Sequence, residues 1–255
     1  MKSVLAFLLL LLHAVPVYAS TNCVVNLSHY DLMRVDFHRM KQEGIVGVIH
    51  EVTYPRYDRD DKYSYRQSSA TRAGMLWGAY HFADATDPVR QADHMLRVVS
   101  TSWLASDPQA RPKEVLLVLD FEKNGHYPGG TMRVHQAVTF INRIRERTGK
   151  YPVVYSNDYR VRDVLNGRAV TSAQRQVLRN CSLWIANYHW QPRTTAPWDH
   201  WSLWQYTGDG ICDVKPRAAF PKHIANVRNA ERNMFRGSRE SLPAFWQRHS
   251  WTPGQ

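Results

Sequence analysis

Two acidic residues separated by one position, Asp120 and Glu122, form a pair that could carry out acid–base catalysis. They directly follow residues 115–119 (VLLVL), a continuously apolar run that predicts a strand buried on both faces of a parallel sheet. Side chains alternate along a strand, so residues two apart face the same side, with Cα atoms roughly 6.6 Å apart. We therefore expect both carboxyl groups to enter one pocket.

Two carboxyl groups in one pocket resist joint ionisation, which raises one pKa and creates a proton donor near neutral pH. Cleavage of a glycosidic bond commonly uses such a pair, with one carboxyl group protonated. The pattern Asp-x-Glu alone is weak evidence, because a chain of this length contains about one by chance. Its position after a buried strand favours the pocket, and an exposed loop with two solvated acids is the alternative.

A site for a sugar polymer also needs aromatic faces with polar tips, and such residues recur at the ends of other predicted strands. Aromatic residues in strands also serve as core, so only their clustering at one end favours a binding role. The candidates are Tyr80, Tyr155, Trp184, Tyr188, Trp204 and Gln205.

Short β-rich runs alternate with helical stretches along the chain. The predicted strands are residues 24–28, 45–49, 75–82, 115–119, 152–155, 183–186 and 201–206, and the predicted helices are 32–43, one opening at Asp87-Pro88, and 132–147. This alternation predicts an α/β fold in which a parallel sheet closes into a barrel. We find no repeat or linker and expect one domain over residues 20–255. In such barrels, chemistry takes place at the carboxyl ends of the strands.

The first residues predict a secretory signal peptide over residues 1–19. Lys2 provides the positive start, residues 4–12 form an apolar run, and residues 17–19 (VYA) supply a small residue before the cut. That run is too short to span a bilayer, which needs about 20 residues. We therefore expect a secreted or periplasmic protein without a transmembrane segment.

The net charge of +11 indicates polyanionic surroundings such as nucleic acid, anionic lipid or an acidic wall polymer. Much of this charge follows Asp213, where a solvated face and a contact with an anionic envelope polymer are both open interpretations. The basic residues there are Lys215, Arg217, Lys222, Arg228, Arg232, Arg236, Arg239 and Arg248. Without a recognisable nucleic-acid module, and with export predicted, we expect no nucleic-acid partner.

The three cysteines, Cys23, Cys181 and Cys212, are too few for a disulfide scaffold. In a barrel, a bridge between Cys181 and Cys212 is disfavoured because they lie at opposite ends, whereas one between Cys23 and Cys181 is open. The sequence contains no CxxC and no HExxH motif, so we expect no metal site and no cofactor.

Several segments, in order, resemble the family 25 glycoside hydrolases, the muramidase-type lysozymes. They are VVNLSHYD (24–31), GAYHFA (78–83), LVLDFE (117–122), YPVVYSN (151–157), LWIANY (183–188), WSLWQYTGDG (201–210) and RNMFRGSRESLPAFW (232–246). The resemblance implies a single flattened β/α barrel with irregular final strands, acting as a monomer on peptidoglycan glycan strands. It further implies cleavage of the β-1,4 bond between N-acetylmuramic acid and N-acetylglucosamine, with Glu122 as general acid assisted by Asp120.

The sequence departs from the family pattern at three places. Asn26 replaces the Asp of the first strand, and an amide can bind a sugar but cannot stabilise a cationic transition state by charge. The later Asp corresponds to Glu231, with Asp213 as the competing candidate under a shorter alignment. The second-strand Lys-Ala-Thr-Glu reads Glu51-Val52-Thr53-Tyr54. These changes make a non-catalytic peptidoglycan- or glycan-binding protein with a lysozyme-like fold the alternative function.

The resulting site hypothesis has two parts. The predicted catalytic residues are Glu122, Asp120 and Glu231, and the predicted substrate-binding residues are Asn26, Tyr80, Tyr155, Tyr188, Trp204, Gln205 and Asp213.

Overall fold

The computed structural model describes residues 20–254, in which eight strands form a closed barrel because β1 pairs with both β2 and β9. The barrel strands are β1 (Thr21–Leu27), β2 (Gly47–Tyr54), β4 (Leu76–Phe82), β5 (Val115–Asp120), β6 (Val153–Asn157), β7 (Ser182–Ala186), β8 (Leu203–Gln205) and β9 (Glu231–Phe235). Two short strands, β3 (Asp58–Arg59) and β10 (Ser250–Trp251), pair with β2 and β5. The α/β barrel expected from the sequence is confirmed. The predicted signal peptide, residues 1–19, lies outside the described residues.

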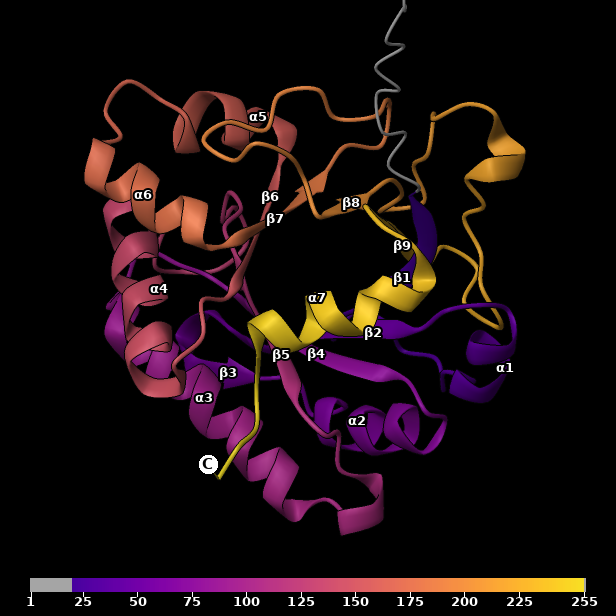
Figure 1. Cartoon of the computed structure of the whole chain (residues 1–255). Helices are drawn as coiled ribbons and strands as arrows, with labels where there is room; N and C mark the ends of the chain where they lie inside the picture. The colour runs from indigo at the N-terminus through magenta and orange to yellow at the C-terminus, as the bar shows by residue number, and fades with distance from the viewer. Residues whose placement is uncertain (1–19, 255) are drawn as a thin grey trace, which may run out of the picture.

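Helices surround the barrel, as Figure 1 shows. They are α1 (Phe37–Gln42), α2 (Tyr63–Arg72), α3 (Pro88–Ala105), α4 (Val134–Thr148), α5 (Asp158–Arg160), α6 (Ser172–Asn180) and α7 (Leu242–His249). The predicted start of α3 is confirmed, because the Asp87 carboxylate accepts hydrogen bonds from the backbone N–H groups of Val89 and Arg90. Gly149 ends α4 in the left-handed conformation, at φ 72°.

Strand β9 runs antiparallel to both of its neighbours, β8 and β1, whereas the other neighbouring pairs within the barrel are parallel. Its first residue therefore lies at the end where the parallel strands finish. In the register, Glu231 stands opposite Asn26, one residue before the end of β1. The reversed strand thus brings a residue from late in the chain to the carboxyl end of the barrel.

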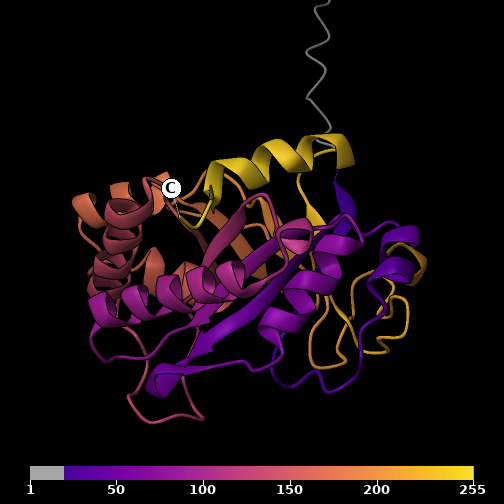
Figure 2. The same ribbon diagram turned by 90° about the horizontal axis from the view of Figure 1, so that it is seen from below.

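Helix α7 covers the opposite, amino end of the barrel. In Figure 2 it lies along the top, and the strands lead away from it. The Trp246 side chain is fully buried, and its indole N–H donates to the Trp77 carbonyl oxygen at 2.9 Å. The ring lies against Gly47 and Gly78, where an added Cβ would come within 2.8 Å and 3.2 Å of it. Two glycines therefore make room for one indole that closes this end.

One local expectation from the sequence is corrected, and the cysteine pairing that the sequence left open is answered. The helix predicted over residues 32–43 begins only at Phe37, because the Asp36 carboxylate accepts from the backbone N–H of Arg39 and caps it there. All three cysteines are free and buried, so the bridge between Cys23 and Cys181 does not form.

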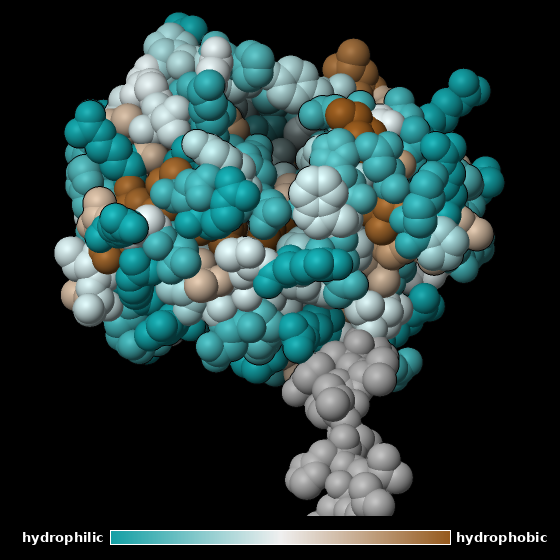
Figure 3. Space-filling view, turned by 90° about the horizontal axis from the view of Figure 1, so that it is seen from above, coloured by the Kyte–Doolittle hydropathy of each residue, from teal (hydrophilic) through white to brown (hydrophobic). Residues whose placement is uncertain are grey.

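The outer surface is largely polar. The face in Figure 3 is mainly hydrophilic, with small and separate hydrophobic patches. Within residues 20–254, no helix combines the length and apolarity needed to cross a bilayer.

We expect Trp246→Ala to lower the free energy of unfolding by about 3–5 kcal/mol, because it removes a buried aromatic side chain and leaves a cavity beside Gly47 and Gly78. Chemical denaturation followed by circular dichroism measures this change. Trp190→Ala, at an exposed tryptophan, is the matched control and should alter stability by less than about 0.5 kcal/mol. If Trp246→Ala lost no more free energy of unfolding than Trp190→Ala, the packing of Trp246 against the barrel would not stabilise the fold.

Candidate active site

A cavity of about 250 Å³ opens at the carboxyl end of the barrel, opposite α7. Its walls come from strand ends and from the loops that follow them, and they include five acidic residues but neither lysine nor arginine. The lining residues are Asn26, Ser28, His29, Tyr30, Glu51, Tyr80, Phe82, Asp120, Glu122, His126, Tyr127, Tyr155, Trp184, Tyr188, Asp209 and Glu231. Seven of the ten predicted site residues are among them.

The Asp120 and Glu122 side chains enter this cavity together, as the strand alternation predicts. Leu116 and Val118 precede them on the inner face of β5, whereas Phe121 packs in the outer layer between barrel and helices. Burial raises the pKa of the Asp120 carboxyl well above its usual range, and the neighbouring Glu122 raises it further. The two neighbouring carboxyl groups therefore resist ionising together.

The Asp120 carboxyl also has an unused hydrogen-bonding position. Its Oδ1 atom is buried and has no hydrogen-bond partner within residues 20–254. Such an atom is costly to leave unpaired, and here it lines a cavity. It is therefore available to a polar group of a bound ligand.

Glu122 lies at the side of the cavity nearest to α5. Asn157, the residue that caps α5, directs its amide Nδ2 toward Glu122 Oε1 at 3.4 Å. Burial raises the pKa of the Glu122 carboxyl, and the contact with Asn157 opposes this increase. A carboxyl group with this balance can retain a proton and still release it, as general acid catalysis requires.

Asn26 and Glu231 form a direct contact across β1 and β9. The Asn26 amide Nδ2 donates to Glu231 Oε2, and its Oδ1 accepts from Gln205 Nε2 at 3.1 Å and from Asn233 Nδ2 at 2.9 Å. Two donors at the oxygen fix the orientation of the amide. Burial raises the pKa of Glu231 to about 8, and the Asn26 contact opposes this increase. Glu231 is therefore also protonated at neutral pH.

Gln205 contacts three residues of the cavity wall from inside the barrel. Its Oε1 accepts hydrogen bonds from the hydroxyl groups of Tyr155, at 2.5 Å, and Tyr188, at 3.0 Å. Together with its contact to Asn26, this fixes two aromatic walls and one polar residue. Gln205 thus positions other site residues and does not itself line the cavity.

Trp204 and Asp213 lie elsewhere. Adjacent strand residues point to opposite faces, so with Gln205 inside the barrel Trp204 points outward, where its indole N–H donates to the Asn187 carbonyl oxygen at 2.8 Å. Asp213 is 61% exposed and pairs with His189, with 2.7 Å between Oδ2 and Nδ1. The structure brings Glu231, and not Asp213, to the other acids.

Several lining residues were not predicted from the sequence, among them Glu51, His29 and Asp209. Strand β2 continues to Tyr54, beyond the predicted residues 45–49, and its alternation carries Glu51 inward. Glu51 accepts from the backbone N–H and the ring Nδ1 of His29, and this hydrogen bond raises the pKa of His29. Continuing the alternation past residue 49 would have found Glu51, whereas Asp209 lies in a loop without a local signal.

A buried arginine holds the loop that carries His29. Arg66 on α2 is 2% exposed, and its guanidinium donates to the backbone carbonyl oxygens of Ser28, Asp31 and Met33. It also contacts His50 Nε2 at 3.0 Å. Loop residues 28–33 are therefore held by a rigid charged group, which fixes one rim of the cavity.

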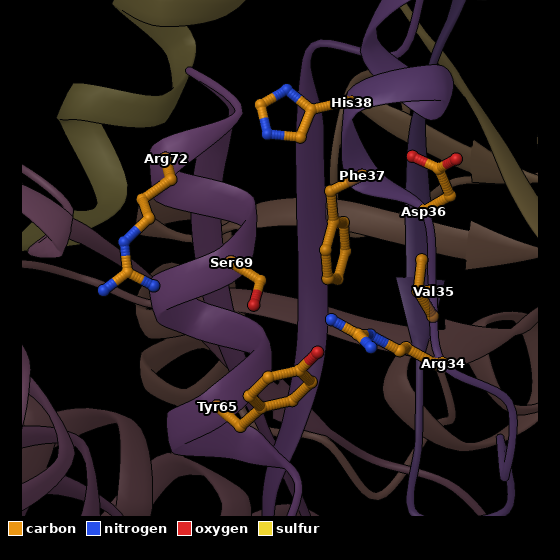
Figure 4. Close-up of a pocket in the computed structure, with 8 residues that line it drawn as sticks. All are labelled: Arg34, Val35, Asp36, Phe37, His38, Tyr65, Ser69 and Arg72. Atoms are coloured by element: carbon orange, nitrogen blue, oxygen red, sulfur yellow. The ribbon is translucent and has the colours of Figure 1, made fainter.

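An outer hollow, on the outside of the barrel, has no pair of acidic residues. It measures about 430 Å³ and lies between residues 34–38 and α2 (Figure 4). Arg34, Tyr65 and Ser69 extend toward its interior. Its single acidic residue, Asp36, already caps α1. The carboxyl-end cavity is therefore the candidate active site.

Comparison with known proteins agrees with this geometry. The sequence matches the family described as "Glycosyl hydrolases family 25" over residues 25–213. Lysozyme M1 of Streptomyces globisporus is 26% identical over 235 residues, covering 87% of this chain and 70% of that protein.

Solved structures show the same fold. A bacterial lysozyme from Streptomyces coelicolor has a TM-score of 0.63 at 24% identity, covering 89% of this chain and 97% of that one. A muramidase from Trichobolus zukalii has a TM-score of 0.64 at 20% identity, covering 88% and 97%. The sequence match spans more than half of the chain and includes Asp120 and Glu122. The protein therefore belongs to glycosyl hydrolase family 25 and is a glycoside hydrolase.

Proposed function

We propose that this protein is a muramidase that hydrolyses the β-1,4 bond between N-acetylmuramic acid and N-acetylglucosamine in peptidoglycan. The observation that carries the proposal is the Asp120–Glu122 pair, two carboxyl groups from one strand in one cavity, each with a raised pKa. Glycoside hydrolysis commonly uses such a pair. Family membership and the similarity to lysozymes support the choice of substrate.

Glu122 acts as the general acid. Its proton passes to the glycosidic oxygen as the bond from that oxygen to the anomeric carbon breaks, which avoids the departure of an alkoxide. The resulting Glu122 carboxylate then removes a proton from the attacking water. Asn157, which contacts Oε1, stabilises this ionised form.

Asp120 binds the 2-acetamido group of the sugar that is cleaved. Its unpartnered Oδ1 accepts the acetamido N–H, which directs the acetamido carbonyl oxygen toward the anomeric carbon as an internal nucleophile. Substrate-assisted hydrolysis of this type is an accepted variant of the two-carboxyl scheme. The hydrogen bond from the acetamido N–H to Asp120 strengthens as positive charge develops on the acetamido group.

Asn26 is compatible with this chemistry because Glu231 carries a proton. A neutral amide beside a protonated carboxyl avoids the repulsion that two carboxylates would suffer in contact. Both groups then bind sugar hydroxyls by hydrogen bonding, and the charged step is left to Asp120 and Glu122. The substrate is exterior to the cell, which agrees with the export expected from the sequence.

Glu122→Gln should lower the rate of peptidoglycan hydrolysis by about 10²- to 10⁴-fold, because glutamine fills the same space but has no proton to donate. Release of reducing ends and of soluble muropeptides from purified peptidoglycan measures the rate. Glu146→Gln, the same change at an exposed helix position, is the control and should keep wild-type activity. Hydrolysis that survives Glu122→Gln would contradict the assigned role.

Glu231 makes stability depend on pH. Its pKa rises from 4.5 to about 8 on folding, so the folded state holds a proton that the unfolded state has lost between these values. The free energy of unfolding should therefore fall in this window, by up to about 1.4 kcal/mol per pH unit, as pH rises. Glu231→Gln should reduce this slope in denaturant titrations from pH 4.5 to 8, leaving the part that the raised pKa values of Asp120 and Glu122 contribute in the same direction. An unchanged slope would contradict the protonated Glu231.

Asn26→Asp separates the enzyme from the binding-protein alternative. The proposed muramidase should gain no kcat at neutral pH, because Glu122 and Asp120 carry out both the proton transfer and the orientation of the acetamido group. A binding protein that lost turnover through Asn26 should instead gain activity of about tenfold or more. Muropeptide release by wild type and variant, measured side by side, distinguishes the two.

A further inference from the structure

The outer hollow, between residues 34–38 and α2, combines exposed basic side chains with buried apolar ones. Arg34, His38 and Arg72 are exposed there, whereas Val35 and Phe37 are buried. Its volume of about 430 Å³ is many times the roughly 30 Å³ that one water molecule occupies in the liquid. The hollow can therefore hold a group considerably larger than a single water or small ion.

The hydrogen-bond donors of this hollow are unused within residues 20–254. Neither Arg34 nor Arg72 forms a hydrogen bond or an ion pair through its side chain, and the same holds for His38. The hydroxyl groups of Tyr65 and Ser69, two side chains that extend toward the interior in Figure 4, also have no partner. Two guanidinium groups and two hydroxyl groups are thus available to one ligand.

The acidic side chains around the hollow do not neutralise these guanidinium groups. Asp36 is the single acidic residue that lines it, and its carboxylate already accepts from the backbone N–H of Arg39 and caps α1. Glu43 pairs with the Arg39 side chain at 2.8 Å. Two guanidinium groups therefore stand against one carboxylate, and the hollow keeps a positive charge that favours an anionic ligand.

The backbone that carries Arg34 is held in place from two sides. Asn226 Nδ2 donates to the Arg34 carbonyl oxygen at 2.7 Å, and Asn226 Oδ1 accepts from the backbone N–H of Asp36 at 3.0 Å. Arg66, in α2, donates to the Met33 carbonyl oxygen at 3.1 Å. Because this segment is already ordered, less conformational entropy is lost when a ligand binds beside it.

The same loop connects the outer hollow with the catalytic cavity. Tyr30 lines the cavity and Arg34 lines the hollow. The chain between these two residues spans at most about 14 Å. The cavity offers five acidic residues and neither lysine nor arginine, so an anionic group finds its cationic partners in the hollow and not in the cavity. One extended polymer can reach both places.

We propose that the outer hollow binds a phosphate group of an anionic wall polymer. Arg34 and Arg72 supply the positive charge, and the hydroxyl groups of Tyr65 and Ser69 donate hydrogen bonds to the phosphate oxygens. Arginine suits this role because its planar guanidinium can donate two parallel hydrogen bonds to one phosphate. This site lies outside the catalytic cavity, and binding there does not require hydrolysis.

The shape of the hollow favours a polyol phosphate over a free phosphate ion. The volume leaves room for the short carbon chain that joins successive phosphates, and the buried Val35 and Phe37 provide an apolar surface for its CH groups. A polymer of this kind that is attached to peptidoglycan holds the enzyme beside its substrate. The positive net charge of the chain attracts the same polymer over a longer range.

Binding of poly(glycerol phosphate) to the intact protein, measured by calorimetry at constant ionic strength, tests the site. The double variant Arg34→Gln/Arg72→Gln should raise the Kd by at least about tenfold, because it removes both charged contacts. The matched control is Arg147→Gln/Arg193→Gln, which removes the same charge at two exposed positions outside the hollow and should change Kd by less than about twofold.

A second variant separates the hollow from the charge of the protein. Ser69→Leu leaves the net charge unchanged but fills part of the hollow, so it should raise the Kd for poly(glycerol phosphate) about three- to tenfold. Circular dichroism checks that the fold is kept. An unchanged Kd in Ser69→Leu, or equal Kd values in the two double arginine variants, would overturn the site and leave only attraction by net charge.

Other probes identify the source and chemistry of the anion. Vesicles of phosphatidylglycerol and phosphatidylcholine that bind the protein where poly(glycerol phosphate) does not would overturn the wall polymer in favour of a lipid headgroup. Polyglutamate bound as tightly as poly(glycerol phosphate) would overturn the preference for phosphate. Peptidoglycan freed of such polymers should be hydrolysed at the wild-type rate by Arg34→Gln/Arg72→Gln, and a lower rate would contradict a site separate from the catalytic acids.

Discussion

The acidic side chains at the carboxyl end of the barrel are largely buried, and this burial raises their pKa values. Asp120, Glu122 and Glu231 all have raised pKa values, with burial as the first cause in each case. A closed ring of strands makes this possible, because apolar layers fill the barrel below the acids and α7 covers its other end. The same carboxyl groups on an exposed loop would ionise at low pH and could donate no proton near neutrality.

The charges of the protein are distributed in opposite ways outside and inside. The chain carries a net charge of +11, yet the catalytic cavity is lined by five acidic residues without lysine or arginine. A positive exterior attracts an anionic polymer over a long range and also tends to ionise carboxyl groups. Burial outweighs this tendency for Asp120 and Glu231, whose pKa values are raised in spite of the positive net charge of the chain.

Residues whose placement follows from local alternation could be predicted from the sequence, and those placed by the closure of the sheet could not. The Asp120–Glu122 pair needs only a two-residue period along β5, and the sequence shows it. The same alternation excludes Trp204 from the cavity, because Gln205 points inward and adjacent strand residues face opposite sides. The prediction that Trp204 lines the site with Gln205 was therefore wrong. Glu231 was predicted only from the resemblance to the family and not from strand alternation, because the antiparallel β9 brings it opposite Asn26.

The antiparallel strand also explains why a neutral residue can stand at the end of β1. Because β9 enters the barrel from the catalytic end, its first side chain meets Asn26 directly and not across a water-filled space. Two ionised groups at that contact would repel each other strongly in a buried site. Either one of them is an amide or they share a proton, and the chain has adopted the first arrangement. Asn26 is thus compatible with a buried Glu231, because the amide adds no second charge at this contact.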